Sequence, residues 1–228
     1  NHPDEINSIF DGAIVYAKGA RLMRMLQQTV GEDAFRQGLS DYFERFAYGN
    51  TDENDLWDAM ATASGRDIRD FMNTWISQSG FPVVSASLSG DKLTLSQKQF
   101  FVGSHGPSDK VWPIPLDANH DTLPALLTEE NLTTSFTGND HLLLNSSDSA
   151  HYITNYDEVL LKRLIDAIAS GKLDAIGRIK LLHERVMLAR SGEVSPASLI
   201  DLLGAYQAEE NEQVWSTIGL ALGELRKY

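Results

Sequence analysis

This sequence shows none of the common patterns of metal-binding or nucleophilic side chains. It contains no cysteine, which excludes disulfides, thiolate zinc sites, iron–sulfur clusters and cysteine nucleophiles. A helical zinc site needs two histidines four residues apart, so that both imidazoles reach one ion from adjacent turns. None of the six histidines has such a partner, since Met187 stands where the pattern begun by His183 and Glu184 would need its second histidine. We therefore interpret His183 as a surface or packing residue and predict no metal site in this chain.

Signatures of other chemistry are missing as well. The sequence has no Gly-x-Ser-x-Gly nucleophile motif, no phosphate-binding loop and no dinucleotide-binding fingerprint. Its 32 acidic residues exceed its 19 basic ones, for a net charge of −13, whereas nucleic acids and anionic membrane surfaces attract clustered Lys and Arg. Its apolar runs are much shorter than the roughly 20 residues that span a bilayer. We expect neither a nucleic acid nor a membrane as a partner.

The elements that must position any site fall into three regions, of which the first is helical. Between residues 12 and 78, apolar residues recur at three- and four-residue steps, which predicts amphipathic helices. One such stripe comprises Phe35, Leu39, Tyr42, Phe43 and Phe46. Asn50 and Glu53 are expected to cap the next helix. The last helix should stop at residues 80–82, because glycine releases the backbone and proline cannot continue a helix.

The second region, residues 83–155, changes to a period of two. Apolar and polar residues alternate on both sides of the turn at residues 89–91, which predicts a β-hairpin. Short apolar runs separated by Gly, Asn, Asp and Ser follow at 100–102, 111–116, 123–127, 142–144 and 152–153. Several short strands at this spacing indicate a small β-sandwich.

The third region, from Asp157 onward, is helical again. Its first two apolar stripes should end at Gly171 and Gly192, and a third helix should begin at Ser195-Pro196. Helix pairs of similar length joined by short turns are typical of the start of an α-solenoid. The sequence as a whole therefore predicts an α+β, multidomain chain.

One segment carries a distinctive motif. Residues 10–26 resemble the segment Phe-Asp-x-Ile-x-Tyr-x-Lys-Gly-Ala-x-x-x-x-Met-Leu of the zinc aminopeptidases of the aminopeptidase N family, bacterial members above all, with one additional residue or an equivalent shift after Asp11. The resemblance continues in order over nearly all of residues 1–160. It includes Phe46-Ala47-Tyr48-Gly49-Asn50-Thr51, Gly80-Phe81-Pro82-Val83, Trp112-x-Ile114-Pro115 and Asn155-Tyr156-Asp157.

The resemblance implies a catalytic role for Tyr16. From composition alone, Tyr16 would be a packed aromatic residue near the start of a helix. In the family, the tyrosine of this motif donates a hydrogen bond to the oxyanion that forms when the scissile carbonyl is attacked, which is chemistry that a phenol can perform. Lys18 receives no catalytic role, and Gly19 and Ala20 are expected to let their helix approach a neighbour closely.

The resemblance also implies what this chain lacks. The family's His-Glu-x-x-His helix, its distal glutamate ligand and its Gly-x-Met-Glu-Asn loop do not occur here and are expected upstream. Zinc would then be bound by the parent outside this chain, which alone should be inactive. The expected parts are the helical end of a thermolysin-like catalytic domain over residues 1–81, a β-sandwich over 82–156 and the beginning of a C-terminal helical domain over 157–228.

The function implied by the resemblance is the removal of N-terminal residues from peptides. We expect a peptide as the substrate and the cytoplasm as the location, with no indication of an oligomeric state. One alternative is a non-catalytic relative that keeps the scaffold for protein association, although a lost active site would have no reason to retain Tyr16. Another is a stand-alone interaction module built from the sandwich and the helices.

Overall fold

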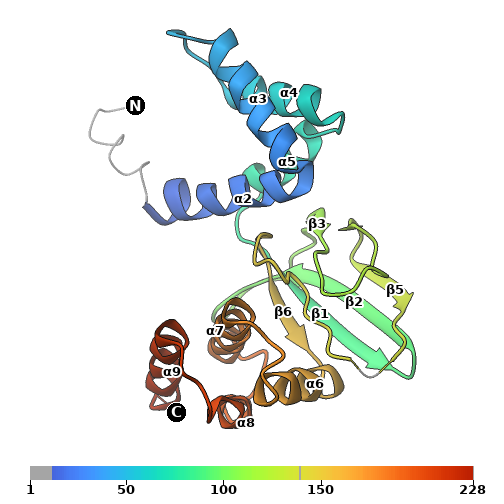
Figure 1. The fold of residues 1–228 in the computed structure, drawn as a ribbon, viewed down its shortest axis with the longest axis vertical. Coiled ribbons are helices and arrows are strands. Elements are labelled where there is room, and N and C mark those ends of the chain that lie inside the picture. The colour runs from blue at the N-terminus through green and yellow to red at the C-terminus, as the bar shows by residue number, and fades with distance from the viewer. Residues whose placement is uncertain (1–11, 139, 228) are drawn as a thin grey trace. The chain divides into compact units, whose positions relative to one another are not determined.

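The computed structural model describes residues 12–138 and 140–227, and these are α+β as predicted (Figure 1). They fall into two compact units. Unit 1 contains the described residues of Asn1–Ser79 together with Ser149–His151, and unit 2 contains those of Gly80–Asp148 and Tyr152–Tyr228. None of the helices in the described part of the chain combines the length and apolarity needed to cross a bilayer.

Unit 1 is helical, as its periodicity predicts. Its elements are the π-helix η1 (Gly12–Lys18) and the α-helices α2 (Gly19–Val30), α3 (Glu32–Arg45), α4 (Glu53–Ser64) and α5 (Arg69–Ser77). Its buried apolar side chains are Leu22, Met25, Leu26, Trp57, Met60, Ile68, Phe71, Met72 and Trp75. Gly38 allows α3 to approach α4, because a Cβ atom there would lie 2.9 Å from the sulfur of Met60.

The cap of α4 differs from the prediction. Asp52, not Asn50, is the N-cap residue: its carboxylate accepts hydrogen bonds from the backbone N–H groups of Asn54 and Asp55, while the Asp55 side chain accepts the N–H of Asp52. The pairing expected between Asn50 and Glu53 is wrong because Glu53 is already the first helical residue. A capping side chain must stand directly before the first turn to reach its unpaired N–H groups.

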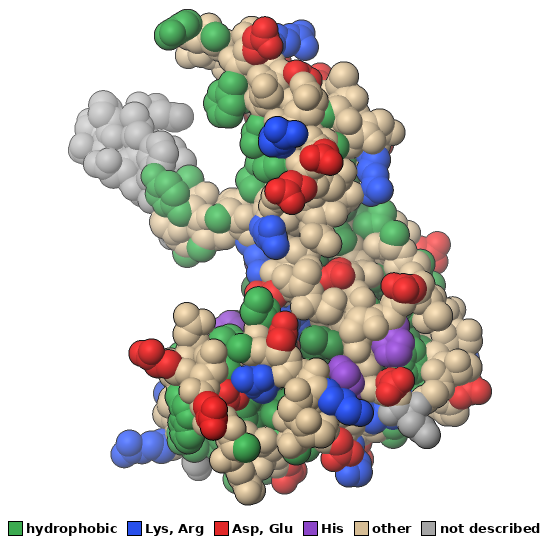
Figure 2. Space-filling model, viewed as in Figure 1, with side chains coloured by type: hydrophobic (Ala, Val, Ile, Leu, Met, Phe, Trp, Pro, Cys, Tyr) green, Lys and Arg blue, Asp and Glu red, His purple; other side chains and the backbone are tan. Residues whose placement is uncertain are grey.

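The apolar stripe of α3 forms a helix as predicted, but much of it is not buried. Gly38 is the buried residue of α3, and Phe43 is 66% exposed. Hydrophobic side chains are accordingly visible on the surface of the unit 1 helices (Figure 2). Periodicity therefore predicted the type of element correctly, while burial also depends on a surface that covers the stripe.

Unit 2 begins with a four-stranded sheet in the order β5-β2-β1-β6. The predicted hairpin is confirmed: β1 (Pro82–Ser89) and β2 (Lys92–Gln99) pair antiparallel, with Leu88 opposite Leu93. On the far side of β1, β6 (Ile153–Tyr156) runs parallel to it. A separate antiparallel ribbon consists of β3 (Ile114–Pro115) and β4 (Leu126–Leu127).

Two features of this region were mispredicted. The edge strand β5 (Asn131–Ser135) was missed because its residues are mostly polar and exposed, which leaves no apolar run to detect. Conversely, the apolar run 142–144 forms only an isolated bridge at Leu144, and 100–102 forms no strand. The backbone N–H groups of Leu143 and Leu144 instead donate to the side chains of Asn119 and Tyr156, at 2.7 and 2.8 Å. These side chains replace a neighbouring strand.

The remaining part of unit 2 is helical. It contains α6 (Glu158–Ala169), α7 (Ala175–Ser191), α8 (Ser198–Leu203), the 3₁₀-helix η2 (Gly204–Tyr206) and α9 (Glu212–Leu225). The third predicted helix starts two residues after Pro196, because residues 195–197 form a turn first. Gly192 ends α7 in the left-handed conformation, as predicted.

The sheet and the helices of unit 2 share polar and apolar contacts. One carboxylate oxygen of Asp157 accepts the N–H of Leu88 on β1 at 2.7 Å, and the other accepts the N–H of Leu160 at 2.9 Å and so caps α6. Val83, Phe100, Ile153 and Leu188 form a common buried cluster. The two parts therefore pack as one structure.

Replacement of Gln97 should reveal how strongly its buried amide stabilises unit 2. The side-chain nitrogen of Gln97 donates to the carbonyl oxygens of Trp112 and Glu129 at 2.9 and 3.0 Å. Its side-chain oxygen accepts a hydrogen bond from the backbone N–H of Trp112 at 2.9 Å. Gln97→Leu keeps a similar side-chain volume but leaves buried backbone groups without partners. The free energy of unfolding, measured in urea, should therefore fall by about 1–3 kcal/mol. The same change at the exposed Gln207 should alter stability by less than about 0.5 kcal/mol. Equal effects would contradict this role.

Glu184 should make the stability of unit 2 depend on pH. Lys180 and Glu184 form a buried ion pair on α7, and the Lys180 ammonium also donates to the carbonyl oxygen of Leu144 at 2.8 Å. Burial raises the pKa of Glu184 from 4.5 to about 7, against the opposing influence of Lys180. Between these values the unfolded state binds fewer protons, so the free energy of unfolding should fall as the pH rises.

This pH dependence can be isolated with Glu184→Gln, which keeps the side-chain shape. In urea unfolding between pH 4.5 and 7, the stability of the variant relative to the wild type should increase with pH. Glu210→Gln, at an exposed position, should follow the wild-type profile. A difference between wild type and Glu184→Gln that stays constant across this range would refute the assigned shift.

Candidate functional site

The residue selected from the motif, Tyr16, lies on the π-helix η1. No residue of η1 is buried, and Tyr16 is 68% exposed, so its phenol is accessible to a ligand. The packed aromatic residue expected from composition alone is therefore not what the structure shows. π-Helical segments are rare and are frequently found at functional sites, which makes η1 the leading candidate.

The motif divides into an exposed and a buried half. Its first residues, Phe10 and Asp11, lie outside the described part of the chain. From Gly12 to Lys18 it forms η1, whereas the methionine and leucine at its end, Met25 and Leu26, are fully buried in the core of unit 1. The second half thus anchors α2, and the first half presents Tyr16.

Lys18, the last residue of η1, connects this segment to α5. Its ammonium donates a partly buried hydrogen bond to the carbonyl oxygen of Gln78 at 3.2 Å. Gln78 is the C-cap residue of α5, where carbonyl groups lack helical partners and the helix dipole favours a positive charge. The expected close approach at Gly19 is wrong, since a Cβ atom there would meet nothing within 4 Å among the described residues.

A histidine distant in sequence joins this neighbourhood. Within unit 1, the ring centroids of His151 and Trp75 are 6.0 Å apart. Burial lowers the pKa of His151 to about 4, and the positive charges of Lys18 and Arg21 contribute in the same direction. His151 is therefore neutral at pH 7. Sequence reasoning could not place it here, because no local pattern links residue 151 to residues 18–21.

The described residues do not offer a donor set that fits zinc. Among residues 12–138 and 140–227, no three His, Asp or Glu side chains gather closely enough to hold an ion. His183 is exposed on α7, while the neighbouring Glu184 is buried and paired with Lys180. No catalytic step is therefore assigned to a metal held by this chain.

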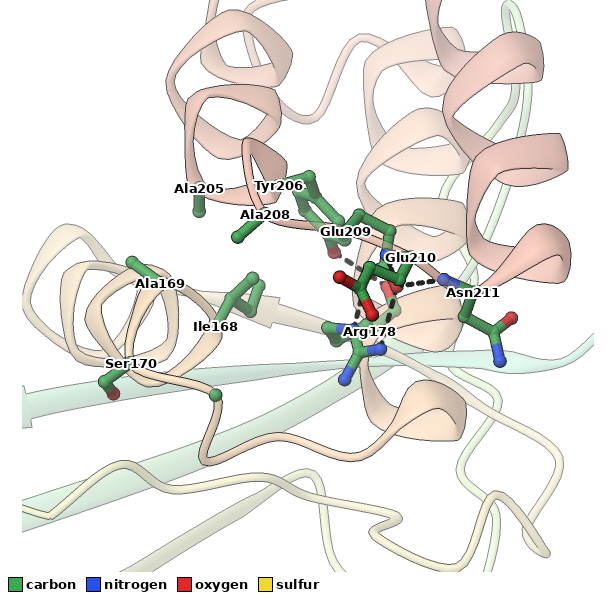
Figure 3. Close-up of a pocket in the computed structure, with 11 residues that line it drawn as sticks. Ile168, Ala169, Ser170, Arg178, Ala205, Tyr206, Ala208, Glu209, Glu210 and Asn211 are labelled. Atoms are coloured by element: carbon green, nitrogen blue, oxygen red, sulfur yellow. Dashed lines mark hydrogen bonds and ion pairs between the residues drawn. The ribbon is translucent and has the colours of Figure 1, made fainter.

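A pocket of about 540 Å³ in unit 2 is a weaker candidate (Figure 3). The Arg178 guanidinium and the Glu209 carboxylate face each other there and form two hydrogen bonds of 2.7 and 2.9 Å. Arg178 also donates to the carbonyl oxygen of Leu173 at 2.6 Å, and the Tyr206 hydroxyl donates to the carbonyl oxygen of Arg178. The hydrogen bond from Arg178 holds the pKa of Glu209 below its usual value. These groups satisfy one another and join α7 to the linker before α9.

Two known protein families match different parts of the chain, one at each end. Residues 1–75 match the peptidase family M1 domain, which includes Tyr16 and most of unit 1. Residues 141–228 match the ERAP1-like C-terminal domain, which includes β6 and the helices that follow it.

Individual relatives extend over nearly the whole chain. Aminopeptidase N of Lactococcus lactis subsp. lactis is 47% identical over 217 residues, covering 92% of this chain and 25% of the relative. Aminopeptidase N of Lactococcus lactis subsp. cremoris (strain MG1363) is 41% identical over 100% of this chain and 27% of its own length. Alanine/arginine aminopeptidase of Saccharomyces cerevisiae is 32% identical over 99% of this chain and 27% of its own length.

The chain spans about a quarter of the length of these relatives. The two family matches and the relatives point to the same group of metallopeptidases. The chain therefore belongs to the peptidase M1 family, among the relatives of aminopeptidase N.

Proposed function

We propose that this chain is part of a zinc-dependent aminopeptidase that removes N-terminal residues from peptides, and that it supplies Tyr16 to the active site. The exposure of Tyr16 on a π-helix, within the residues that match the M1 domain, is the observation that carries the proposal. An exposed phenol that does not contribute to the core is available to bind a substrate.

Tyr16 would act by hydrogen bonding during peptide hydrolysis. When the scissile carbonyl is attacked, its oxygen acquires negative charge that was absent in the bound peptide. A phenol retains its proton at neutral pH and can donate to that oxygen. Because the interaction strengthens as the charge develops, it lowers the barrier rather than only tightening substrate binding.

The remaining residues would serve as scaffold. We assign residues 1–81 to the helical end of a thermolysin-like catalytic domain, 82–156 to a β-sandwich and 157–228 to the beginning of the C-terminal helical domain. The matches over residues 1–75 and 141–228 support the outer two assignments. The shared core of the sheet and the helices that follow it would make the second and third parts a single support.

The zinc of such an enzyme would be held by residues outside this chain, as the family resemblance implies. Zinc supplies an activated water and polarises the carbonyl, so we expect this chain by itself to have no peptidase activity.

The proposed role can be tested with Tyr16→Phe in the full-length aminopeptidase. Loss of one oxyanion donor should lower kcat about 10²- to 10³-fold, while KM and the zinc content, measured by metal analysis, stay near wild type. Tyr48→Phe removes the hydroxyl of a fully exposed tyrosine of unit 1 and should leave kcat unchanged. Activity of Tyr16→Phe within a factor of a few of wild type would exclude the oxyanion role.

A further inference from the structure

We propose that Lys18 is a positioning residue for Tyr16, because it ties the end of the π-helix η1 to the C-terminal end of α5. The inference rests on the proposed function of Tyr16 and extends it. Lys18 has no part in the reaction itself, and its contribution passes through the orientation of the segment that carries the phenol.

The contact that carries the inference joins two segments 60 residues apart. The Lys18 ammonium donates to the carbonyl oxygen of Gln78 at 3.2 Å, in a partly buried position. Gln78 has an extended backbone conformation and directly follows the last helical residue of α5, Ser77. A positive charge is favoured at this end of a helix, and its unpaired carbonyl groups need donors from elsewhere.

Such a contact matters because core packing does not fix η1. None of its residues is buried, whereas α2, directly after it, is anchored by Leu22, Met25 and Leu26. Lys18 occupies the junction between the two helices and is half-buried. It lies two residues after Tyr16, so a displacement of Lys18 would move the phenol with it.

Lys18 is also close enough to His151 to influence the protonation of its ring. Lys18 and Arg21 are the cations that act on the partly buried His151 ring and help to keep it unprotonated. His151 is neutral at pH 7 and adds no further positive charge beside Lys18.

The position of a donor matters in catalysis, since a misplacement of about 1 Å can cost 10²-fold in rate. In the full-length aminopeptidase, Lys18→Met, which keeps an unbranched side chain one atom shorter and removes the donor, should lower kcat about 10- to 100-fold. KM and the zinc content should change little. Lys18→Arg, which can still donate to the Gln78 carbonyl, should retain most of the activity.

A double-mutant cycle separates positioning from a general structural effect. The wild type, Lys18→Met, Tyr16→Phe and the double variant are compared by kcat. If Lys18 acts through the Tyr16 hydroxyl, Lys18→Met should cost less than about twofold once that hydroxyl is removed. Arg24→Met is the matched control, because Arg24 lies on α2 and donates to Gln27 of the same helix. It removes a similar charge without releasing η1 and should leave kcat unchanged.

Other outcomes would overturn the inference. An equal loss of kcat from Lys18→Met in the wild type and in the Tyr16→Phe variant would show that Lys18 acts independently of the phenol. Unchanged activity of Lys18→Met would show that the tether is dispensable. If Lys18→Met does not accumulate as folded protein, the cycle is repeated with Lys18→Leu, which also removes the donor and should give the same non-additive loss. Full activity of Tyr16→Phe would instead remove the proposed function, and the inference with it.

Discussion

The fold of unit 2 depends on the requirement that polar groups taken out of water keep hydrogen-bond partners. The Asp157 carboxylate provides two such partners, since one oxygen accepts a backbone N–H of β1 and the other accepts an N–H at the start of α6. It thereby joins the sheet to the first of the helices that follow it. Gln97 bonds to two backbone segments beside β2, and Lys180 reaches from α7 to the carbonyl oxygen of Leu144. The contacts of Asp157 with β1, of Gln97 and of Lys180 join segments that are distant in sequence, in the same unit as the hydrophobic cluster around Leu188.

In unit 1, one motif contains both core residues and the exposed Tyr16 to which we assign a function. Met25 and Leu26 contribute to the core, while Tyr16 in the same motif contributes nothing to it. A residue that binds a substrate must remain accessible, and a segment without buried side chains has to be oriented by other contacts. The Lys18 ammonium on the Gln78 carbonyl provides such a contact. A hydrogen bond from a lysine to a helix end can therefore orient this segment without burying the phenol.

Local patterns predicted much of the secondary structure. The hairpin of β1 and β2 and the helices α6 and α7 were predicted, because alternation and helical periodicity require only near neighbours in the sequence. Prediction failed where the partner is distant or polar. The strand β5 has no apolar signal, and the backbone of residues 142–144 is satisfied by the side chains of Asn119 and Tyr156. The local pattern of apolar and polar residues carries no information about such distant partners.

The sequence by itself determined the family and selected Tyr16, because both depend on the order and identity of neighbouring residues. It also determined the α+β composition, through the change from a helical period to a period of two and back. Only the tertiary structure decided that Tyr16 is exposed, that Lys18 reaches the end of α5 and that His151 is held neutral among residues of unit 1. Exposure, long-range hydrogen bonds and desolvation are properties of the three-dimensional surroundings of a side chain, and these form only when distant segments pack together.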